Sequence, residues 1–293
     1  MRRLGTAVLQ SDAVSQPLAD IHGFIVIYPI ATADSNCSNA NTAARLTHDG
    51  GSDSLAIVNM VSYTVSKYGA ATSKVFATGS SSGAIMPNVM CGAHPDVFAA
   101  GATFSGMLFG CLAGSSGSST SSANPACADR QIQHTGAEWA TIVHDAYPGY
   151  TGSYPRMLLW HGTVENVIYY QDFLEEIKEW STILDVEFTQ NVTNTPQVGY
   201  TAMIYGDGRY MVAYSAAGVG HYVPTHETQA LSFFGLDSDT PGGGSTGGSG
   251  PSTFVTSTAQ SPTSVAPTGN CGAMWGQCGG TGWTGATCCS SGT

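Results

Sequence analysis

The sequence predicts an α/β fold built on a mostly parallel sheet, and three observations lead to this prediction. Short apolar runs alternate with runs of helical periodicity from residue 23 to about residue 237. This alternation is typical of parallel sheets, whose strands are joined by helical crossovers. Hydrophobic residues make up 42% of the 293 residues, enough for a sizeable core. Residues 79–83 have the pattern of a sharp turn from a strand into a helix.

The first predicted elements follow the order strand, helix, strand, helix. The apolar run Gly23–Pro29 is expected to be a strand, and Ser54–Tyr68 has apolar residues at helical spacing until a glycine ends it. Lys74–Thr78 is short, apolar and β-prone, and Ser82–His94 is expected to be the helix that follows it. Pro87 lies inside that helix, which it should kink or shorten at a cost of ~3 kcal/mol.

The later elements continue the alternation. Ala99–Phe104 and Met157–Trp160 are expected to be further buried strands. Met211–Ser215 is predicted to be the last strand and Thr225–Phe234 the closing helix. Together with the earlier elements they complete the predicted α/β domain.

An amphipathic helix is predicted over Phe173–Leu184. Its apolar residues Ile177 and Trp180 are expected to face the core. Four charged residues are expected on its solvent-facing side: Glu175, Glu176, Lys178 and Glu179.

The composition changes abruptly at residue 238. Residues 238–269 are nearly all Gly, Ser, Thr, Pro, Ala or Val without periodicity, which predicts a linker. Residues 270–293 hold four of the eight cysteines and two tryptophans. We therefore expect a catalytic domain over residues 1–237, a linker over 238–269 and a small disulfide-rich module over 270–293.

Charge and cysteine content limit the compartment and the partners. With a formal net charge of −11, the chain is not expected to bind nucleic acid or an anionic membrane, whereas a neutral polysaccharide would tolerate it. The sequence contains no apolar run of about 20 residues, which is the length that a membrane-spanning helix needs. The eight cysteines, with glycosylation sequons at Asn36 and Asn191, favour an extracellular protein. No signal peptide is visible after Met1, so the natural N-terminus is expected to lie upstream.

The pentapeptide Gly79-Ser80-Ser81-Ser82-Gly83 matches the G-x-S-x-G turn that exposes a nucleophilic serine. The predicted strand before it and helix after it are the context that this motif needs. The glycines leave the strained turn free of side chains beside Ser81. In a chain with 37 glycines the match could arise by chance, so its chemistry depends on partners for Ser81.

Two residues after Ser81 have the types and the chain order of such partners. A serine hydroxyl needs a histidine to take its proton, and a carboxylate must orient that histidine. Glu165 follows the strand that ends at Trp160, and His221 follows the last predicted strand in a glycine-rich loop. Taken singly, Glu165 could be a surface loop acid and His221 an ordinary loop histidine. Their order, serine, acid and histidine, is that of the α/β-hydrolases.

The other histidines have ordinary structural interpretations. His48 and His144 are expected in a loop and on a helix face, and His94 ends the helix after the nucleophile, where a cation suits the helix dipole. No grouping of His, Cys and Asp has the sequence spacing of a metal site. Neither a metal nor another cofactor is therefore expected.

Five stretches carry a resemblance to a known family. They are Gly23–Pro29, Leu46–Gly51, Val75–Ala84, Tyr147–Tyr150 and Gly218–His221. Through them the region from about residue 19 to residue 237 resembles carbohydrate esterase family 1, and most of all its fungal acetylxylan esterases that carry a cellulose-binding module. The resemblance implies an α/β-hydrolase fold and a Ser/Asp/His triad, with Ser81 as nucleophile and His221 as general base.

The chain departs from that family pattern at the acid and before Ala19. Glu165 stands where the family has aspartate, and a misplacement of ~1 Å can cost ~100-fold in rate. The family has further strands before Ala19, one of them beside the nucleophile strand. The loop after that strand donates one oxyanion-hole N–H, and the residue after the nucleophile, here Ser82, donates the other. We therefore expect an α/β-hydrolase sheet that lacks its first strands.

The tail resembles a family 1 carbohydrate-binding module through Trp275–Gly285. Such modules lay aromatic rings flat on crystalline cellulose, and Trp275 would be one of these rings. The module pattern continues past Thr293 with two more cysteines. The chain is therefore expected to be incomplete at both ends.

These expectations combine into a leading function with alternatives. The leading interpretation is a secreted, monomeric serine esterase that removes acetyl groups from acetylated xylan and is targeted to a cellulose surface. A feruloyl esterase on the same scaffold is the first alternative, and a polyester depolymerase fits the cellulose module less well. A non-catalytic wall-binding protein is an alternative of another class, since Glu165 and the expected missing strand both allow it.

Overall fold

The computed structural model describes residues 5–10, 15–30, 40–113, 124–128 and 130–237. The chain divides into two units, 1–244 and 245–293, and every described residue lies in the first unit. The expected linker and cellulose-binding module, including Trp275, thus lie outside the described residues, as do Cys37 and its sequon. No helix within the described ranges is long and apolar enough to cross a bilayer.

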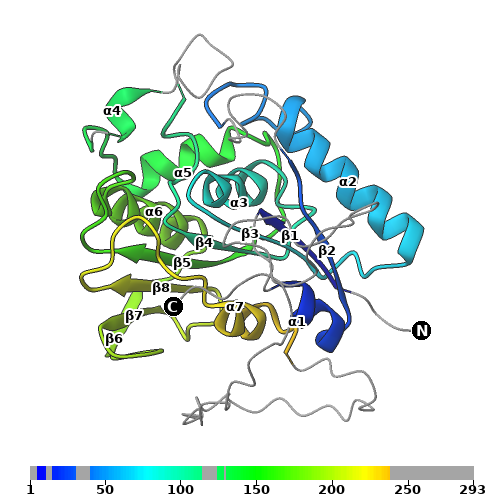
Figure 1. The fold of residues 1–293 in the computed structure, drawn as a ribbon. Coiled ribbons are helices and arrows are strands. Elements are labelled where there is room, and N and C mark those ends of the chain that lie inside the picture. Colours follow the sequence, from blue (N-terminus) through cyan, green and yellow to red (C-terminus); the bar gives the residue numbers. More distant parts are fainter. Residues whose placement is uncertain (1–4, 11–14, 31–39, 114–123, 129, 238–293) are drawn as a thin grey trace, which may run out of the picture. The chain divides into compact units, whose positions relative to one another are not determined.

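The described residues form an eight-stranded sheet with the order β2-β1-β3-β4-β5-β8-β7-β6 (Figure 1). Neighbours from β2 to β8 pair in parallel, whereas β7 and β6 continue the sheet in antiparallel fashion. The mostly parallel α/β sheet predicted from the sequence is confirmed. The strands are β1 Gly5–Gln10, β2 Phe24–Ile27, β3 Val75–Ser80, β4 Ala100–Phe104, β5 Arg156–Gly162, β6 Phe188–Thr193, β7 Tyr200–Tyr205 and β8 Met211–Ala216.

Helices cover both faces of this sheet (Figure 1). On one face α2, α3, α5 and α6 pack over a large apolar cluster, and on the other α1 and α7 cover a smaller cluster. Covering both faces is what a parallel sheet of near-continuous apolar strands requires. The helices are α1 Ser15–His22, α2 Ser52–Tyr68, α3 Ser82–Ala93, α4 Pro125–Ala128, α5 Gly136–His144, α6 Tyr170–Ile183 and α7 Glu227–Phe234.

The strand beside the nucleophile strand is present, which corrects an expectation. Thr6–Gln10 of β1 pairs in parallel with Val75–Gly79 of β3, and the other edge of β1 pairs with β2. The central position expected to be empty is therefore filled from the first ten residues. Sequence reasoning placed the similarity to the family only from about Ala19 and so assigned no strand before it. The edge of β3 thus has its backbone hydrogen bonds satisfied.

The orientation predicted for α6 is wrong for its glutamates. Glu175, Glu176 and Glu179 are almost completely buried, with at most 1% of each residue exposed. Buried carboxyl groups need hydrogen-bond partners, and other elements supply them. Glu176 accepts from Asn88 Nδ2 at 2.7 Å, and Glu179 accepts from the backbone N–H of Phe109 at 3.0 Å.

Two smaller features concern α3 and the cysteines. Pro87 does not shorten α3, which continues to Ala93. Cys111 and Cys127 form a disulfide, and Cys91 is a free buried thiol. Burial raises the pKa of the Cys91 thiol far above its ordinary value, so it remains protonated and unreactive.

Candidate active site

Ser81 occupies a strained turn between β3 and α3. Its φ of 55° and ψ of −126° lie outside the regions that non-glycine residues favour. A Cβ on Gly79 would lie 2.2 Å from the carbonyl oxygen of Gly83, so only glycine fits at this close approach. The backbone N–H of Ser81 donates to the carbonyl of Phe104 at 3.0 Å, which ties the turn to β4. This is the strand–turn–helix context that the sequence motif requires.

His221 reaches Ser81 from the loop that follows β8. Its Nε2 lies 2.8 Å from Ser81 Oγ across 140 residues of sequence. The loop comes close to the end of β5, because a Cβ on Gly162 would lie 2.1 Å from the carbonyl oxygen of Val219. Position 162 must therefore be glycine for the loop to bring His221 close to Ser81.

Glu165 holds the other side of the imidazole. Its Oε2 accepts a hydrogen bond from His221 Nδ1 at 2.8 Å. Its Oε1 accepts from the backbone N–H groups of Val167 at 2.7 Å and Ile168 at 3.3 Å. Because a carboxylate can only accept here, Nδ1 of His221 carries the proton and Nε2 keeps a lone pair toward Ser81. The extra methylene of glutamate is thus accommodated by a loop that anchors the carboxylate.

His161 is a supporting residue that sequence reasoning did not single out. It is fully buried, and its Nε2 donates to the carbonyl of Ile168 at 2.8 Å, which fastens the loop that holds Glu165. Burial lowers the pKa of His161 to about 4, so the ring is neutral at the pH of most media. Its place at the end of β5, four residues before the acid, was the available sequence signal.

One expected oxyanion-hole donor is described. Ser82 is the first residue of α3, so its N–H has no acceptor within the helix and is available to a bound anion. The second donor is expected in the loop after the strand beside β3. In this chain that loop is residues 11–14, which lie outside the described residues.

A polar cleft of about 360 Å³ lies beside Glu165. The guanidinium of Arg130 is 4.1 Å from the centre of the Tyr169 ring, which is cation–π contact. Tyr222, next to His221, is 84% exposed. The residues that line the cleft are Arg130, Gln133, Thr163, Glu165, Tyr169, Tyr170 and Gln171.

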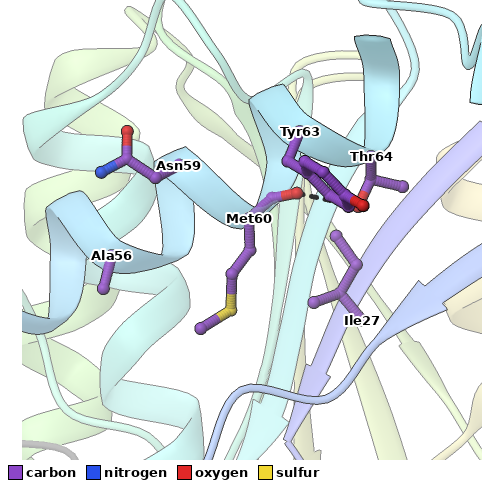
Figure 2. A pocket seen from close by; sticks show the side chains of 6 residues that line it. All are labelled: Ile27, Ala56, Asn59, Met60, Tyr63 and Thr64. Carbon is purple, nitrogen blue, oxygen red and sulfur yellow. Dashed lines mark hydrogen bonds between the residues drawn. The ribbon is translucent and has the colours of Figure 1, made fainter. Parts of the chain in front are cut away.

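A second hollow lies between β2 and α2, away from these residues (Figure 2). Its volume is about 540 Å³, and Ile27, Ala56 and Met60 give it a mainly apolar wall. The Thr64 hydroxyl donates to the carbonyl of Met60 at 2.8 Å, within the helix itself. No nucleophile with an adjacent base lines this hollow, so Ser81 remains the candidate for the chemistry.

Comparison with known proteins shows the family of the chain. The model of the esterase PHB depolymerase family matches residues 8–168, which run from the end of β1 past the turn at Ser81. The chain belongs to this esterase family. The fungal cellulose-binding domain matches residues 274–293. The carboxylic ester hydrolase, the α/β-hydrolase fold and the cellulose-binding module expected from the sequence are thereby confirmed.

Individual relatives carry two kinds of name. The chain is 59% identical over 274 residues to feruloyl esterase B of Talaromyces stipitatus, covering 93% of this chain and 75% of that protein. It is 40% identical over 299 residues to acetylxylan esterase A of Talaromyces purpureogenus, covering 94% and 73%. The structure of an acetyl xylan esterase from Aspergillus awamori superposes with a TM-score of 0.76 at 37% identity, covering 80% of this chain and 90% of that one.

Proposed function

We propose that this esterase cleaves acyl esters carried by plant cell-wall xylan, with Ser81 as nucleophile, His221 as general base and Glu165 as the orienting acid. The single observation that carries the proposal is the hydrogen-bonded series Ser81–His221–Glu165, with both contacts at 2.8 Å. A serine, its base and the group that orients the base are the three parts of nucleophilic acyl transfer.

In this mechanism His221 Nε2 takes the proton of Ser81 as Oγ forms a bond to the ester carbonyl carbon. The carbonyl electrons move to the oxygen, and the N–H of Ser82 stabilises that oxyanion. The intermediate collapses, the bond to the sugar oxygen breaks, and His221 returns the proton to the leaving hydroxyl. Water then attacks the acyl carbonyl carbon while His221 takes its proton. When this second intermediate collapses, the bond to Ser81 Oγ breaks, His221 returns the proton to Ser81, and the free acid leaves.

The acyl group that the esterase removes is a further part of the proposal, and the relatives favour ferulate over acetate. Four relatives named feruloyl esterase B are 44–59% identical to the chain, whereas those named acetylxylan esterase A are 40–42% identical. We therefore propose feruloylated xylan as the substrate. Acetylated xylan, the leading expectation from sequence, remains the second candidate, supported by the acetyl xylan esterase structure at a TM-score of 0.76.

The experiment compares methyl ferulate and acetylated xylan as substrates of the full-length protein. We expect kcat/KM for methyl ferulate to exceed that for release of acetate from the xylan by at least tenfold. Ser81→Ala should abolish both activities, and a variant that keeps more than a few per cent would refute the nucleophile. Release of acetate from xylan at the higher rate would select the second candidate instead.

The remaining parts of the proposal concern targeting. We propose that residues 238–269 link the esterase domain, 1–237, to a cellulose-binding module over 270–293 in which Trp275 contacts the polysaccharide. The match of residues 274–293 to the fungal cellulose-binding domain supports this division. An insoluble cell-wall substrate also requires an extracellular enzyme, so we propose that the protein is secreted. We propose in addition that it acts as a monomer.

A further inference from the structure

Three side chains from separate segments meet beyond the end of α3 that is farther from Ser81. His48 comes from the loop before α2, His94 directly follows α3, and Asp96 lies two residues later. One nitrogen or oxygen atom from each lies within 4.8 Å of the others. The expectation of no metal-site grouping rested on sequence spacing, which gave no sign of this cluster because His48 and His94 are far apart in the sequence.

His94 is the buried member of the cluster. The residue has no exposed surface, and within the described part of the chain neither ring nitrogen has a hydrogen-bond partner. A buried imidazole without partners is uncommon, because desolvated polar atoms are costly to leave unpaired. A bound cation would give one of these ring nitrogens a partner.

His48 is oriented for the same role. Its Nδ1 lies 2.8 Å from the carbonyl oxygen of Ala93, which can only accept, so Nδ1 carries the proton. The ring also stacks on Tyr147 with centroids 3.6 Å apart. A histidine that donates one N–H to a carbonyl and presents the other nitrogen is the usual arrangement of a metal-binding imidazole.

The surroundings of His48 Nε2 favour a cation. Asp49 Oδ2 lies 3.4 Å from it, so in the neutral ring a lone pair faces a carboxylate oxygen. Two ligands of a tetrahedral zinc ion with bonds of 2.0–2.2 Å are ~3.4 Å apart. Asp96 Oδ1 lies 3.8 Å from the other ring nitrogen, Nδ1, and so adds a second carboxylate beside the ring. The C-terminal end of α3 adds the negative end of a helix dipole.

We propose that His48, His94 and Asp96 form a binding site for a divalent transition metal, zinc in particular, with Asp49 beside it as a further oxygen ligand. Imidazole and carboxylate ligands suit zinc, and closing the cluster to bonding distance needs side-chain shifts on the order of 1 Å. The site lies about 18 Å along α3 from Ser81, since its 12 residues rise 1.5 Å each. Its role would be to fasten the loop before α2 to the helix that begins at the nucleophile.

The test is a zinc titration of the full-length protein, prepared without a histidine tag and treated with a chelator. Calorimetry should show one equivalent bound with micromolar or tighter affinity. Zinc at about 100 times its Kd should raise the Tm by roughly 5–10 °C. Asp96→Asn, at an exposed position, should weaken binding by ~10–100-fold, and His94→Gln should abolish it.

A matched control is His144→Gln, because His144 is exposed and lies outside the cluster. This variant should bind zinc as the parent does. Absence of saturable binding by the parent would overturn the proposal, and so would an affinity unchanged in Asp96→Asn. In either case the contact between His48 and Asp49 has no part in metal binding. Asp96→Asn keeps the test decisive if His94→Gln fails to fold.

Discussion

Glu165 shows how one residue adapts to a position where the family uses a shorter acid. Its Oε1 is held by two backbone N–H groups at 2.7 and 3.3 Å, which leaves Oε2 for His221. The two residues before Glu165 hold that loop, because the backbone N–H groups of Thr163 and Val164 donate to the carbonyls of Ala216 and Val219. Chain order was enough to identify the acid from the sequence, but its anchoring also depends on the end of β8 and the loop that follows it.

The first prediction separates charge from length at Glu165. Glu165→Gln removes the charge, and its amide can select the wrong tautomer of His221, so we expect kcat to fall by ~10⁴. Glu165→Asp keeps the charge but withdraws the carboxylate by about one bond, so a loss of ~10² is expected. Steady-state kinetics of the purified variants measure both. Equal losses in the two variants would contradict the geometric role.

The second prediction tests the close approach at Gly162. Gly162→Ala places a Cβ 2.1 Å from the carbonyl oxygen of Val219, so the His221 loop must move. We expect a loss of about 3 kcal/mol or more in the free energy of unfolding, with activity also reduced. Gly220→Ala in the same loop is the control, since its Cβ would lie 4.0 Å from the carbonyl oxygen of Val164, an ordinary contact distance. Similar urea midpoints for the two variants would disprove the steric argument.

At the scale of elements, α6 is the helix whose packing sequence reasoning misjudged. Its heptad-like pattern puts charged residues next to apolar ones, and glutamate is almost never fully buried unless paired. The partners are distant in sequence, since Asn88 lies in α3 and Thr103 in β4. Local periodicity therefore carried no signal that Glu176 is a core residue.

This burial makes the contribution of the carboxyl groups to stability depend on pH. Burial raises the pKa of Glu176 to about 7, and that of Asp172 also to about 7. Between pH 4.5 and 7 these two groups bind more protons in the folded state than in the unfolded state, so their contribution to stability falls as the pH rises through that range. The lowered pKa of His161 acts in the opposite direction, so a Glu176 variant is needed to isolate the carboxyl contribution. The decrease from Glu176 alone should approach about 3 kcal/mol. Urea unfolding at a series of pH values measures it.

Glu176→Gln is the variant that tests this assignment. Its amide oxygen can still accept from Asn88 and Thr103 but does not titrate, so the decrease in stability with pH should become smaller. The control is Glu187→Gln, at an exposed position before β6, which should leave the slope unchanged. A slope that is identical in the parent and in Glu176→Gln would exclude Glu176 as its source.

The edge strand β6 was also missed, for a different reason. All six residues of β6 are exposed, so the strand has no buried face to produce an alternating pattern. It exists because it pairs with β7, which in turn pairs with β8. By contrast, the buried strands β3 and β4 were predicted to within one or two residues at each end, because their continuous apolar runs reflect burial on both faces.

At the scale of the whole molecule, we expect catalysis and cellulose binding to be carried by separate parts of the chain. A chain ending at residue 237 keeps every described element of the sheet, so its kcat/KM on a soluble ester should equal that of the full-length protein within about twofold. The same truncation should abolish binding to crystalline cellulose, and Trp275→Ala should weaken it. A pull-down on cellulose measures the binding. Loss of soluble activity on truncation would show that the tail supports the esterase fold.

Short local runs of residues were enough to predict the turn at Ser81, the chain order of Ser81, Glu165 and His221, and the esterase family. The contact of the Glu165 carboxylate with His221, the burial of Glu176 in the core and the meeting of His48 with His94 became visible only in the folded chain. Those facts depend on contacts between segments tens of residues apart, which are set by the packing of helices on the sheet. Local propensity and periodicity carry no information about such contacts.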